Sequence, residues 1–387
     1  MSQWRKVTLF VVAFGALLVV GGGAGAAAAI WGYGRSLNRS AAHTSALQDI
    51  PSSARPSPVG GSAGKAGNIL LLGSDSRSPE TTVASRSDTI MLLHIDADHR
   101  HGYVISIPRD TWVYVPRSSN GRHGDTMAKI NAGYAWGGVE LAVRTIERFT
   151  GVRIDHVVVI DFSGFQRVVD TLGGLDLRVD QTITSIFPPH RTYLAGTRHF
   201  TGAQALDYVR QRYQFADGDF TRERHQQEFL AALLEKATSS GTLADPVRLD
   251  AFLRAVTKSV TIDKDFDLVS TALELRHLGR SDVTFLTSPS AGTGRRDGQS
   301  VVEPDTAKVA AFYHAVASDQ VARYLHPTPG TVPDASPASP GGPSSPAALS
   351  SPAAGAGRRS PTTRAVRPSP TTSAGRPSPT VATSPTR

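Results

Sequence analysis

Four arginines stand close together between residues 208 and 229, where the chain reads YVRQRYQFADGDFTRERHQQEF. They are Arg210, Arg212, Arg222 and Arg224. A guanidinium group stays charged and can bind two phosphate oxygens at once, so several of them in one pocket favour a phosphate, above all a pyrophosphate, as ligand. The competing interpretation is a solvated ion-pair network, because acidic residues are interspersed with the arginines. These are Asp217, Asp219, Glu223 and Glu228.

A second group of charges follows from three short apolar runs that predict buried strands. The runs are residues 68–73 (NILLLG), 88–96 (DTIMLLHID) and 103–108 (YVISIP), each bounded by turn-forming or charged text. If the strands run up, down and up, the end of the first, the start of the second and the end of the third share one edge of the sheet. That edge would carry Asp75, Arg77, Arg86, Asp88, Arg109 and Asp110. Sites on open sheets usually form at such an edge.

Asp75 and Asp88 could hold a metal ion at this edge. Two carboxylates a few ångströms apart repel each other unless a cation lies between them, and Mg²⁺ prefers oxygen ligands. The alternative is that each carboxylate forms a salt bridge with a neighbouring arginine, Arg77 or Arg86. The spacing alone does not separate these two interpretations.

The elements that must position these groups alternate between helices and strands. Residues 137–151 and 163–174 have helical periodicity and end at glycines, while residues 156–162 (HVVVIDF) and 175–180 (LDLRVD) read as strands. This order predicts an α/β fold in which helices cover a central mixed sheet.

Two further helices flank the arginines of the opening segment. One starts at Thr201, and a longer amphipathic helix runs from Thr221 to about residue 237. Arg222 and Gln226 are four residues apart and would share a face of its first turns. Arg210 and Arg212 would share a face only if the chain there is extended.

Composition divides the chain into five parts. Residues 7–30 are an uncharged stretch of 24 residues after Arg5 and Lys6, which predicts a membrane anchor with the N-terminus in the cytoplasm and the rest extracytoplasmic. A cleaved signal peptide is the alternative. The predicted parts are a cytoplasmic N-terminus and anchor (1–34), a flexible linker (35–67), a catalytic domain (68–240), a helical extension packed on it (241–326) and a disordered tail rich in Pro, Ser and Thr (327–387).

Charge and residue types exclude several functions. Residues 68–326 carry 29 Lys and Arg against 31 Asp and Glu, so the basic character of the whole chain belongs to its flanks and no nucleic-acid partner is expected. The chain has no cysteine, which rules out disulfides and thiolate metal sites. Phosphate-loop, H-E-x-x-H and G-x-S-x-G motifs are missing, and the histidines lack a convincing metal-binding spacing.

The ordered motifs of the chain closely resemble those of the LytR-CpsA-Psr family, and high Ala, Gly, Arg and Pro usage hints at an actinobacterial member. The resemblance spans about residues 68–240 and rests on five motifs. They are GSDSR (73–77), RSDT (86–89), SIPRDT (106–111), KIN (129–131) and YVRQRY followed by GDFTRERHQQEF. Many actinobacterial relatives carry a second small C-terminal domain, and at the corresponding place this sequence has the tail rich in Ser, Thr and Pro, so we expect that domain to be missing.

The resemblance implies a membrane-anchored phosphotransferase that joins an anionic glycopolymer to peptidoglycan. Such enzymes take the polymer from a polyprenyl pyrophosphate carrier, make a phosphodiester with a muramic acid hydroxyl and hold the lipid tail in an apolar tunnel of an α/β/α fold. By motif position, Asp75 and Asp88 would bind Mg²⁺ or Mn²⁺. Contacts to the pyrophosphate would come from Arg86, Arg109, Lys129, Arg210, Arg212, Arg222 and Gln226. The catalytic group would be Arg109, Arg212, Arg222 and Asp219, with Asp219 or Asp88 as the acid–base residue.

Three other functions compete with transfer. A pyrophosphatase that trims lipid carriers would use the same charged cluster with water as the nucleophile. A non-catalytic wall-binding protein would use the arginines only to hold anionic polymer. A transcriptional attenuator is disfavoured, because the predicted anchor leaves only six residues on the cytoplasmic side. The glycopolymer itself cannot be read from the sequence.

Overall fold

The computed structural model of this chain describes residues 32–61, 63–74, 87–215, 218–238, 245–275 and 277–327. The predicted anchor (residues 7–30) and nearly all of the predicted tail lie outside these ranges. Within the described residues, none of the helices combines the length and the apolar composition needed to cross a bilayer.

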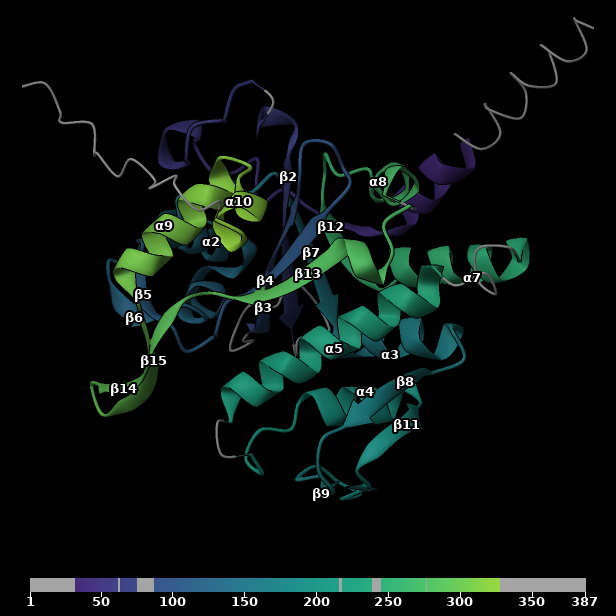
Figure 1. Cartoon of the computed structure of the whole chain (residues 1–387). Helices are drawn as coiled ribbons and strands as arrows, with labels where there is room; N and C mark the ends of the chain where they lie inside the picture. The colour runs from purple at the N-terminus through teal and green to yellow at the C-terminus, as the bar shows by residue number, and fades with distance from the viewer. Residues whose placement is uncertain are drawn as a thin grey trace, which may run out of the picture. The chain divides into compact units, whose positions relative to one another are not determined.

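A mixed sheet of seven strands forms the centre of the fold (Figure 1), which confirms the predicted class. Its order is β1-β12-β7-β2-β3-β4-β13, with parallel pairing of β1 with β12, β7 with β2 and β4 with β13 and antiparallel pairing elsewhere. In that order the strands are Ala42–Thr44, Val260–Asp263, His156–Asp161, Gly67–Ser74, Ser87–Ile95, Gly102–Ser106 and Val283–Thr287.

The three strands predicted from apolar runs do run up, down and up. β2 pairs antiparallel with β3, and β3 pairs antiparallel with β4. The end of β2 (Ser74), the start of β3 (Ser87) and the end of β4 (Ser106) therefore share one edge of the sheet. β7 lies beside β2 in parallel, with Asp161 paired to Ser74, so its end meets the same edge.

Helices cover both faces of the sheet. On one face lie α2 (Ala132–Thr150), α9 (Thr306–Ala317) and α10 (Val321–Leu325), which share one buried core with the sheet. On the other side of the sheet lie α3 (Phe162–Thr171), α5 (Asp219–Thr238) and α7 (Pro246–Thr257), with α4 (Gly202–Val209) beneath α5 (Figure 1). The short helix α8 (Leu268–Glu274) packs beside β12 through Leu268.

Four two-stranded ribbons surround this body. They are β5 (Trp112–Val115) with β6 (Thr126–Lys129), β8 (Leu175–Val179) with β11 (Gly196–Phe200), β9 (Ile183–Thr184) with β10 (Thr192–Tyr193), and β14 (Ser290–Arg296) with β15 (Gln299–Pro304). Three short 3₁₀ turns occupy Ser52–Ala54, Ala63–Lys65 and Arg280–Asp282.

Local signals fix several helix ends where the sequence places them. Gly151 ends α2 with φ at 69°, a left-handed conformation that glycine adopts at little cost. Thr201 starts α4 with a capping box, because its side chain accepts from the Gln204 backbone N–H. α2 differs from the prediction: it includes one more turn, and the chain breaks from helical geometry at Gly137 and Gly138. α5 begins two residues earlier than predicted, at Asp219.

The prediction of a flexible linker over residues 35–67 is wrong for the described part of that segment. Residues 32–40 are helical, and β1 adds an edge strand to the central sheet by pairing with β12. Leu37 is 2% exposed, and Leu47 and Ile50 are buried in the core beside α2. The segment is poor in large apolar residues, but three of them occupy buried positions, whereas Val59 is 42% exposed.

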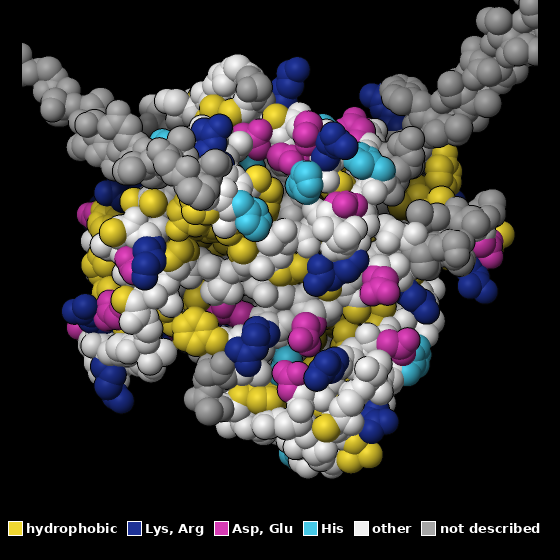
Figure 2. Space-filling view, viewed as in Figure 1, with side chains coloured by type: hydrophobic (Ala, Val, Ile, Leu, Met, Phe, Trp, Pro, Cys, Tyr) yellow, Lys and Arg dark blue, Asp and Glu magenta, His cyan; other side chains and the backbone are white. Residues whose placement is uncertain are grey.

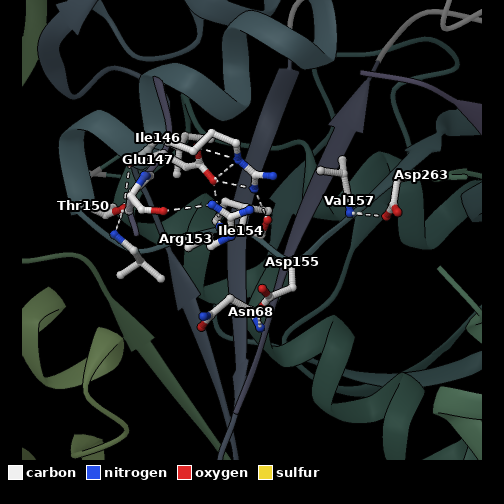
Figure 3. A network of polar contacts seen from close by, with 12 residues as sticks. Asn68, Ile146, Glu147, Thr150, Arg153, Ile154, Asp155, Val157 and Asp263 are labelled. Atoms are coloured by element: carbon white, nitrogen blue, oxygen red, sulfur yellow. Dashed lines mark hydrogen bonds and ion pairs between the residues drawn. The ribbon is translucent and has the colours of Figure 1, made fainter. Parts of the chain in front are cut away.

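A buried ion pair further fixes this segment. The Arg55 guanidinium donates to the Glu147 carboxylate of α2, with Nη2 2.7 Å from Oε1. Glu147 also accepts from the Ile154 backbone N–H at 2.9 Å, and Arg153 donates to the Pro56 carbonyl at 2.9 Å. Figure 3 shows Glu147 and Ile154 within this network, beside the Asn68 and Asp155 contact at the start of β2.

Residues 241–326 also differ from the predicted helical extension. They supply β12 and β13, which pair with β7 and β4 inside the central sheet. The described residues before and after residue 240 therefore belong to one compact unit. The sequence predicts one strand here, at residues 282–289 (DVTFLTSP), where β13 lies, but it does not predict β12, which is only four residues long.

Candidate functional site

A cavity of about 410 Å³ lies between the central sheet and helices α3, α4 and α5. Its walls are mainly apolar. The sheet contributes Leu71, Leu72, Met91, Val158, Ile160 and Val260, and the helices contribute Phe165, Val168, Leu206, Val209, Phe229, Leu230 and Leu233. Phe165 and Phe229 stack with their ring centroids 4.2 Å apart. Such a lining suits a hydrocarbon chain.

Charged side chains line the same cavity, and several of them come from the sheet edge where β2 and β7 end and β3 begins. They are Asp88, Arg109, Asp161, Arg210, Arg212 and Arg222. Asp88 and Asp161 lie at this edge by register, whereas Leu71, Met91 and Val158 lie further along the strands. The cavity thus has a charged mouth and an apolar interior. Four arginines against two carboxylates, among the described lining residues, favour an anion at the mouth.

Asp88 and Arg109 meet at this mouth, as the predicted edge requires. The Arg109 Nη1 atom donates to the Asp88 carboxylate, and its Nε lies 3.5 Å from Oδ2 of Asp110. Lys129, at the end of β6, is paired with the same Asp110, with Nζ 2.9 Å from Oδ1. Lys129 is not among the residues that line the cavity. Its predicted contact with the ligand stays a prediction, and in the structure it supports Arg109 through their shared partner Asp110.

Arg210 and Arg212 both line the cavity at the end of α4. The Arg210 guanidinium lies between two aromatic rings, 4.4 Å from the Phe162 centroid and 4.3 Å from the Phe187 centroid. The Arg212 guanidinium lies over the Tyr213 ring, 4.4 Å from its centroid, and donates to the Tyr213 hydroxyl. The sequence required an extended chain for the two arginines to share a side, but Arg210 has the right-handed helical conformation, with φ at −93° and ψ at −12°. Both side chains nevertheless line the cavity.

Arg222 and Gln226 come from the first two turns of α5 and share a face, as predicted. Arg222 is 4% exposed, so its charge acts in a largely desolvated position. Gln227, the residue after Gln226, donates from Nε2 to the Ser106 Oγ and to the Leu286 carbonyl, each at 2.9 Å. These bonds fix the start of α5 against β4 and β13.

Arg224 is exposed and does not line the cavity, so it is not part of the site. Its neighbour His225 is buried and stacks on Tyr208, whose hydroxyl lies 3.1 Å from Nε2 of His225. Burial raises the pKa of Tyr208, so the phenol keeps its proton and donates to the Arg178 carbonyl at 3.2 Å. These contacts join α4, α5 and β8 to one another next to the site.

Four of the charged residues named from the sequence lie outside the residues that the structure describes. They are Asp75, Arg77, Arg86 and Asp217. Asp219 is the first residue of α5, but its side chain is not described. The predicted metal site of Asp75 and Asp88 therefore stays a prediction.

The lining residues that the sequence did not predict for the site include Asp161, Phe162, Phe187 and Tyr213. Asp161 caps α3 by accepting from the Gly164 N–H at 2.6 Å. The parallel insertion of β7 beside β2, which brings Asp161 and Phe162 to the mouth, has no local signal. Ile186 and Phe187 are two apolar residues in a loop, and that unusual feature could have identified Phe187.

A separate group of possible metal ligands occurs in the turn between β3 and β4. Oxygen and nitrogen atoms of Asp96, Asp98 and His101 lie within 4.8 Å of one another. Asp96 accepts from the backbone N–H groups of Arg100 and His101, at 3.0 and 3.1 Å. The backbone N–H of Arg100 also lowers the pKa of Asp98. These carboxylates stabilise the turn, which explains their position without a metal.

The surface in Figure 2 carries Lys and Arg side chains interspersed with Asp and Glu, with hydrophobic side chains between them. No extended patch of one sign covers that face. This agrees with the near balance of charge in residues 68–326.

Two named cell wall proteins are similar in sequence to this chain. LcpA of Corynebacterium glutamicum, a cell wall biosynthesis protein, is 32% identical over 292 residues, which are 66% of this chain and 56% of LcpA. The match thus spans just over half of LcpA. TagU of Bacillus cereus, named as a polyisoprenyl-teichoic acid–peptidoglycan teichoic acid transferase, is 30% identical over 266 residues, 68% of this chain and 82% of TagU.

Solved structures share the fold. TagT bound to LIIa-WTA matches with a TM-score of 0.55 at 23% identity, over 72% of this chain and 99% of TagT. A LytR-Csp2A-Psr enzyme from Actinomyces oris matches with a TM-score of 0.54 at 23% identity, over 73% of this chain and 95% of that one. At this level of identity the likeness concerns the fold alone. The sequence pattern of the LytR_cpsA_psr family matches residues 32–318, about three quarters of the chain and the part that builds the sheet and the cavity, and the protein therefore belongs to that family.

Proposed function

We propose that this protein transfers an anionic glycopolymer from a polyprenyl pyrophosphate carrier to peptidoglycan. The observation that carries the proposal is an apolar cavity whose mouth holds Arg109, Arg210, Arg212 and Arg222. An isoprenoid tail matches the interior, and a pyrophosphate matches four guanidinium groups. Teichoic acid and peptidoglycan appear in the name of the relative TagU, which supports the same class of donor and acceptor here.

In the proposed reaction, an acceptor hydroxyl oxygen attacks the phosphorus that carries the glycopolymer. A new phosphodiester bond forms, the bond from that phosphorus to the bridging oxygen breaks, and polyprenyl phosphate leaves with the bonding electrons. The arginines would neutralise charge that develops on the phosphoryl oxygens, which is the main contribution a protein makes to phosphoryl transfer. Asp219, with Asp88 as the alternative, would accept the hydroxyl proton.

A divalent cation, Mg²⁺ or Mn²⁺, is part of this proposal. Asp88 suits it because its carboxylate lines the cavity and its side chain keeps 37% exposure beside the Arg109 contact. Carboxylate oxygens are the ligands that such ions prefer, and Asp75 would supply a second carboxylate. When bound, the ion would neutralise pyrophosphate charge. Mn²⁺ binding measured by electron paramagnetic resonance should weaken in Asp88→Asn, and equal binding in both proteins would remove Asp88 from the cation site.

The location of the enzyme is also a proposal. Residues 7–30 would anchor it, with the N-terminus in the cytoplasm and the catalytic part outside, next to the carrier lipid and the wall. The chain has no cysteine, so a single Ser281→Cys variant at an exposed position offers a clean test. A membrane-impermeant maleimide should label it in intact cells. Labelling only after the cells are broken would overturn this orientation.

The experiment on function uses the full chain in detergent, a lipid-linked glycopolymer and peptidoglycan oligomers. Transfer predicts a product in which polymer and glycan strand are joined by a phosphodiester, together with free polyprenyl phosphate, by mass spectrometry. Free polymer phosphate without the joined product would show a pyrophosphatase instead. Binding of the donor with no turnover would indicate a wall-binding protein.

A further inference from the structure

The guanidinium of Arg210 is held between two phenyl rings from different parts of the chain. Its Cζ lies 4.4 Å from the Phe162 centroid and 4.3 Å from the Phe187 centroid. Among the described residues, Arg210 has no ion pair with a carboxylate. Both rings lie within cation–π distance of the guanidinium carbon, and the guanidinium N–H groups can donate to a ligand.

The two rings are themselves firmly placed. Phe162 is the first residue of α3 and directly follows β7, and Asp161 caps this helix start. Phe187 lies in the loop between β9 and β10, where its backbone N–H donates to the Ser185 Oγ at 3.0 Å. Ser185 is 2% exposed, so the loop is held from a buried position.

A buried polar network connects this loop to the end of α4, where Arg210 is located. Ser185 Oγ donates to Oδ1 of Asp207 at 2.6 Å, and Gln211 Nε2 donates to the same oxygen at 2.7 Å. Tyr193 donates its hydroxyl to Oδ2 of Asp207 at 2.7 Å. Both carboxylate oxygens of Asp207 are thereby satisfied, and burial raises the pKa of Tyr193, so that donor keeps its proton.

Asp207 and Gln211 stand three residues before and one residue after Arg210. Gln211 also accepts from the Ile186 backbone N–H at 3.3 Å and donates to Ser185 Oγ at 2.8 Å. One network therefore fixes both the backbone that carries Arg210 and the loop that carries Phe187. A shift of either would separate the Phe187 ring from the Arg210 guanidinium.

We propose that Phe187, seated by the Asp207, Ser185 and Gln211 network and opposed by Phe162, is a positioning residue that aims the Arg210 guanidinium edge at the pyrophosphate. This inference rests on the proposed function for the identity of the ligand. Phe187 acts through Arg210 and needs no contact with the reacting atoms. Its aromatic face matters because a quadrupole attracts the cation, whereas an aliphatic side chain only fills space.

The test compares Phe187→Leu, which keeps apolar bulk, with Phe187→Trp, which keeps an aromatic face. The probe is farnesyl pyrophosphate, with farnesyl monophosphate for comparison, and its binding to the full chain is measured by calorimetry. We expect Phe187→Leu to weaken pyrophosphate binding roughly threefold to thirtyfold, and Phe187→Trp to stay within about twofold of the wild type. In the Arg210→Ala background the Leu and Trp variants should bind equally.

Two outcomes overturn the inference. One is wild-type affinity in Phe187→Leu. The other is an equal loss in the Arg210→Ala background, which would mean that the ring acts through packing alone. A melting temperature for Phe187→Leu close to that of the wild type excludes unfolding as the cause. If the wild type binds no pyrophosphate, the proposed function fails and this inference fails with it, whereas tight binding that ignores Phe187 defeats only the inference.

The contribution of the Asp207, Ser185 and Gln211 network to the position of Phe187 can be measured separately. Ser185→Ala removes the hydroxyl that links Asp207 to the Phe187 N–H, while Ser185→Thr retains a hydroxyl. The ring current of Phe187 should shift the NMR signal of the Arg210 Nε–H, and this shift should decrease in Ser185→Ala and return in Ser185→Thr. An unchanged signal in Ser185→Ala would show that the loop holds Phe187 without the network.

Discussion

Arg109 donates to the carboxylate of Asp88 across the sheet edge that the ends of β2, β3 and β4 share. The contact joins residues 21 positions apart and holds a guanidinium at the cavity mouth before any ligand is present. A preorganised donor of this kind costs no reorganisation when charge develops on a phosphoryl oxygen. Arg109 is therefore the arginine whose removal should affect turnover most directly.

Arg109→Ala should lower the rate of polymer transfer by about 100- to 1,000-fold, the usual loss on removing one preorganised donor. Folding stability should change little, because Asp88 is partly exposed and can be solvated once its partner is gone. The rate is measured with lipid-linked polymer, and stability by urea unfolding. Arg100→Ala, an exposed arginine in the turn after β3, is the matched control. Near-normal turnover in Arg109→Ala would contradict this role.

The buried pair of Arg55 and Glu147 gives a prediction for stability. Both side chains are almost fully buried, at 8% and 1% exposure, so removing one partner leaves an uncompensated buried charge. Arg55→Ala should lower the free energy of unfolding by about 3–5 kcal/mol, whereas replacing both residues by leucine and methionine should cost much less. Urea unfolding measures both.

The exposed pair of Asp250 and Arg254 on α7 is the control for that experiment. It has the i, i+4 spacing of an ordinary surface ion pair, and its loss should change stability little. A similar small effect for Arg55→Ala would show that residues 32–61 are not an integral part of the fold.

The sequence allowed correct prediction where a signal is local. Gly151 and Thr201 mark helix ends through their own backbone preferences, and the apolar runs of β2, β3 and β4 required only short turns or loops between them. The meeting of Asp88 with Arg109 followed from that simple topology.

Long-range pairing was the part that could not be predicted. β1 pairs with β12 more than two hundred residues later in the chain, and only this pairing makes residues 42–44 a strand. The insertion of β7 beside β2 likewise brings Phe162 next to Arg210. In both cases the segment's own composition is compatible with several conformations, and tertiary contacts select one.

The apolar interior predicts a dependence on the length of the lipid. Leu233 of α5 lines the cavity, and a tryptophan there would occupy space that an isoprenoid tail needs. Leu233→Trp should weaken binding of a long polyprenyl pyrophosphate by roughly ten- to a hundredfold. Binding of dimethylallyl pyrophosphate should be nearly unchanged, because the arginines at the mouth are untouched.

Glu235→Trp, two residues along the same helix and exposed, controls for the added ring. Equal effects on both ligands would place the lipid elsewhere.

His94 on β3 predicts how stability varies with pH. The ring is 1% exposed, with Nε2 3.3 Å from Oδ1 of Asp319 and Nδ1 2.8 Å from the Asn68 carboxamide. Burial lowers the pKa of His94, and the carboxylates of Asp319, Asp96 and Asp155 oppose that shift only in part. In the unfolded chain the ring titrates near its ordinary value of about 6.5.

Because the folded state binds this proton less readily than the unfolded state, the contribution of His94 is present above the unfolded pKa and is lost as the pH falls below it. The free energy of unfolding should therefore decrease from pH 7.5 to pH 5, and the decrease should be smaller in His94→Gln, which cannot be protonated. Urea unfolding at both pH values measures the difference. Asp98, exposed in the following turn, offers Asp98→Asn as a control that leaves the His94 contribution in place. A decrease that is identical in the wild type and in His94→Gln would show that other groups carry the acid sensitivity.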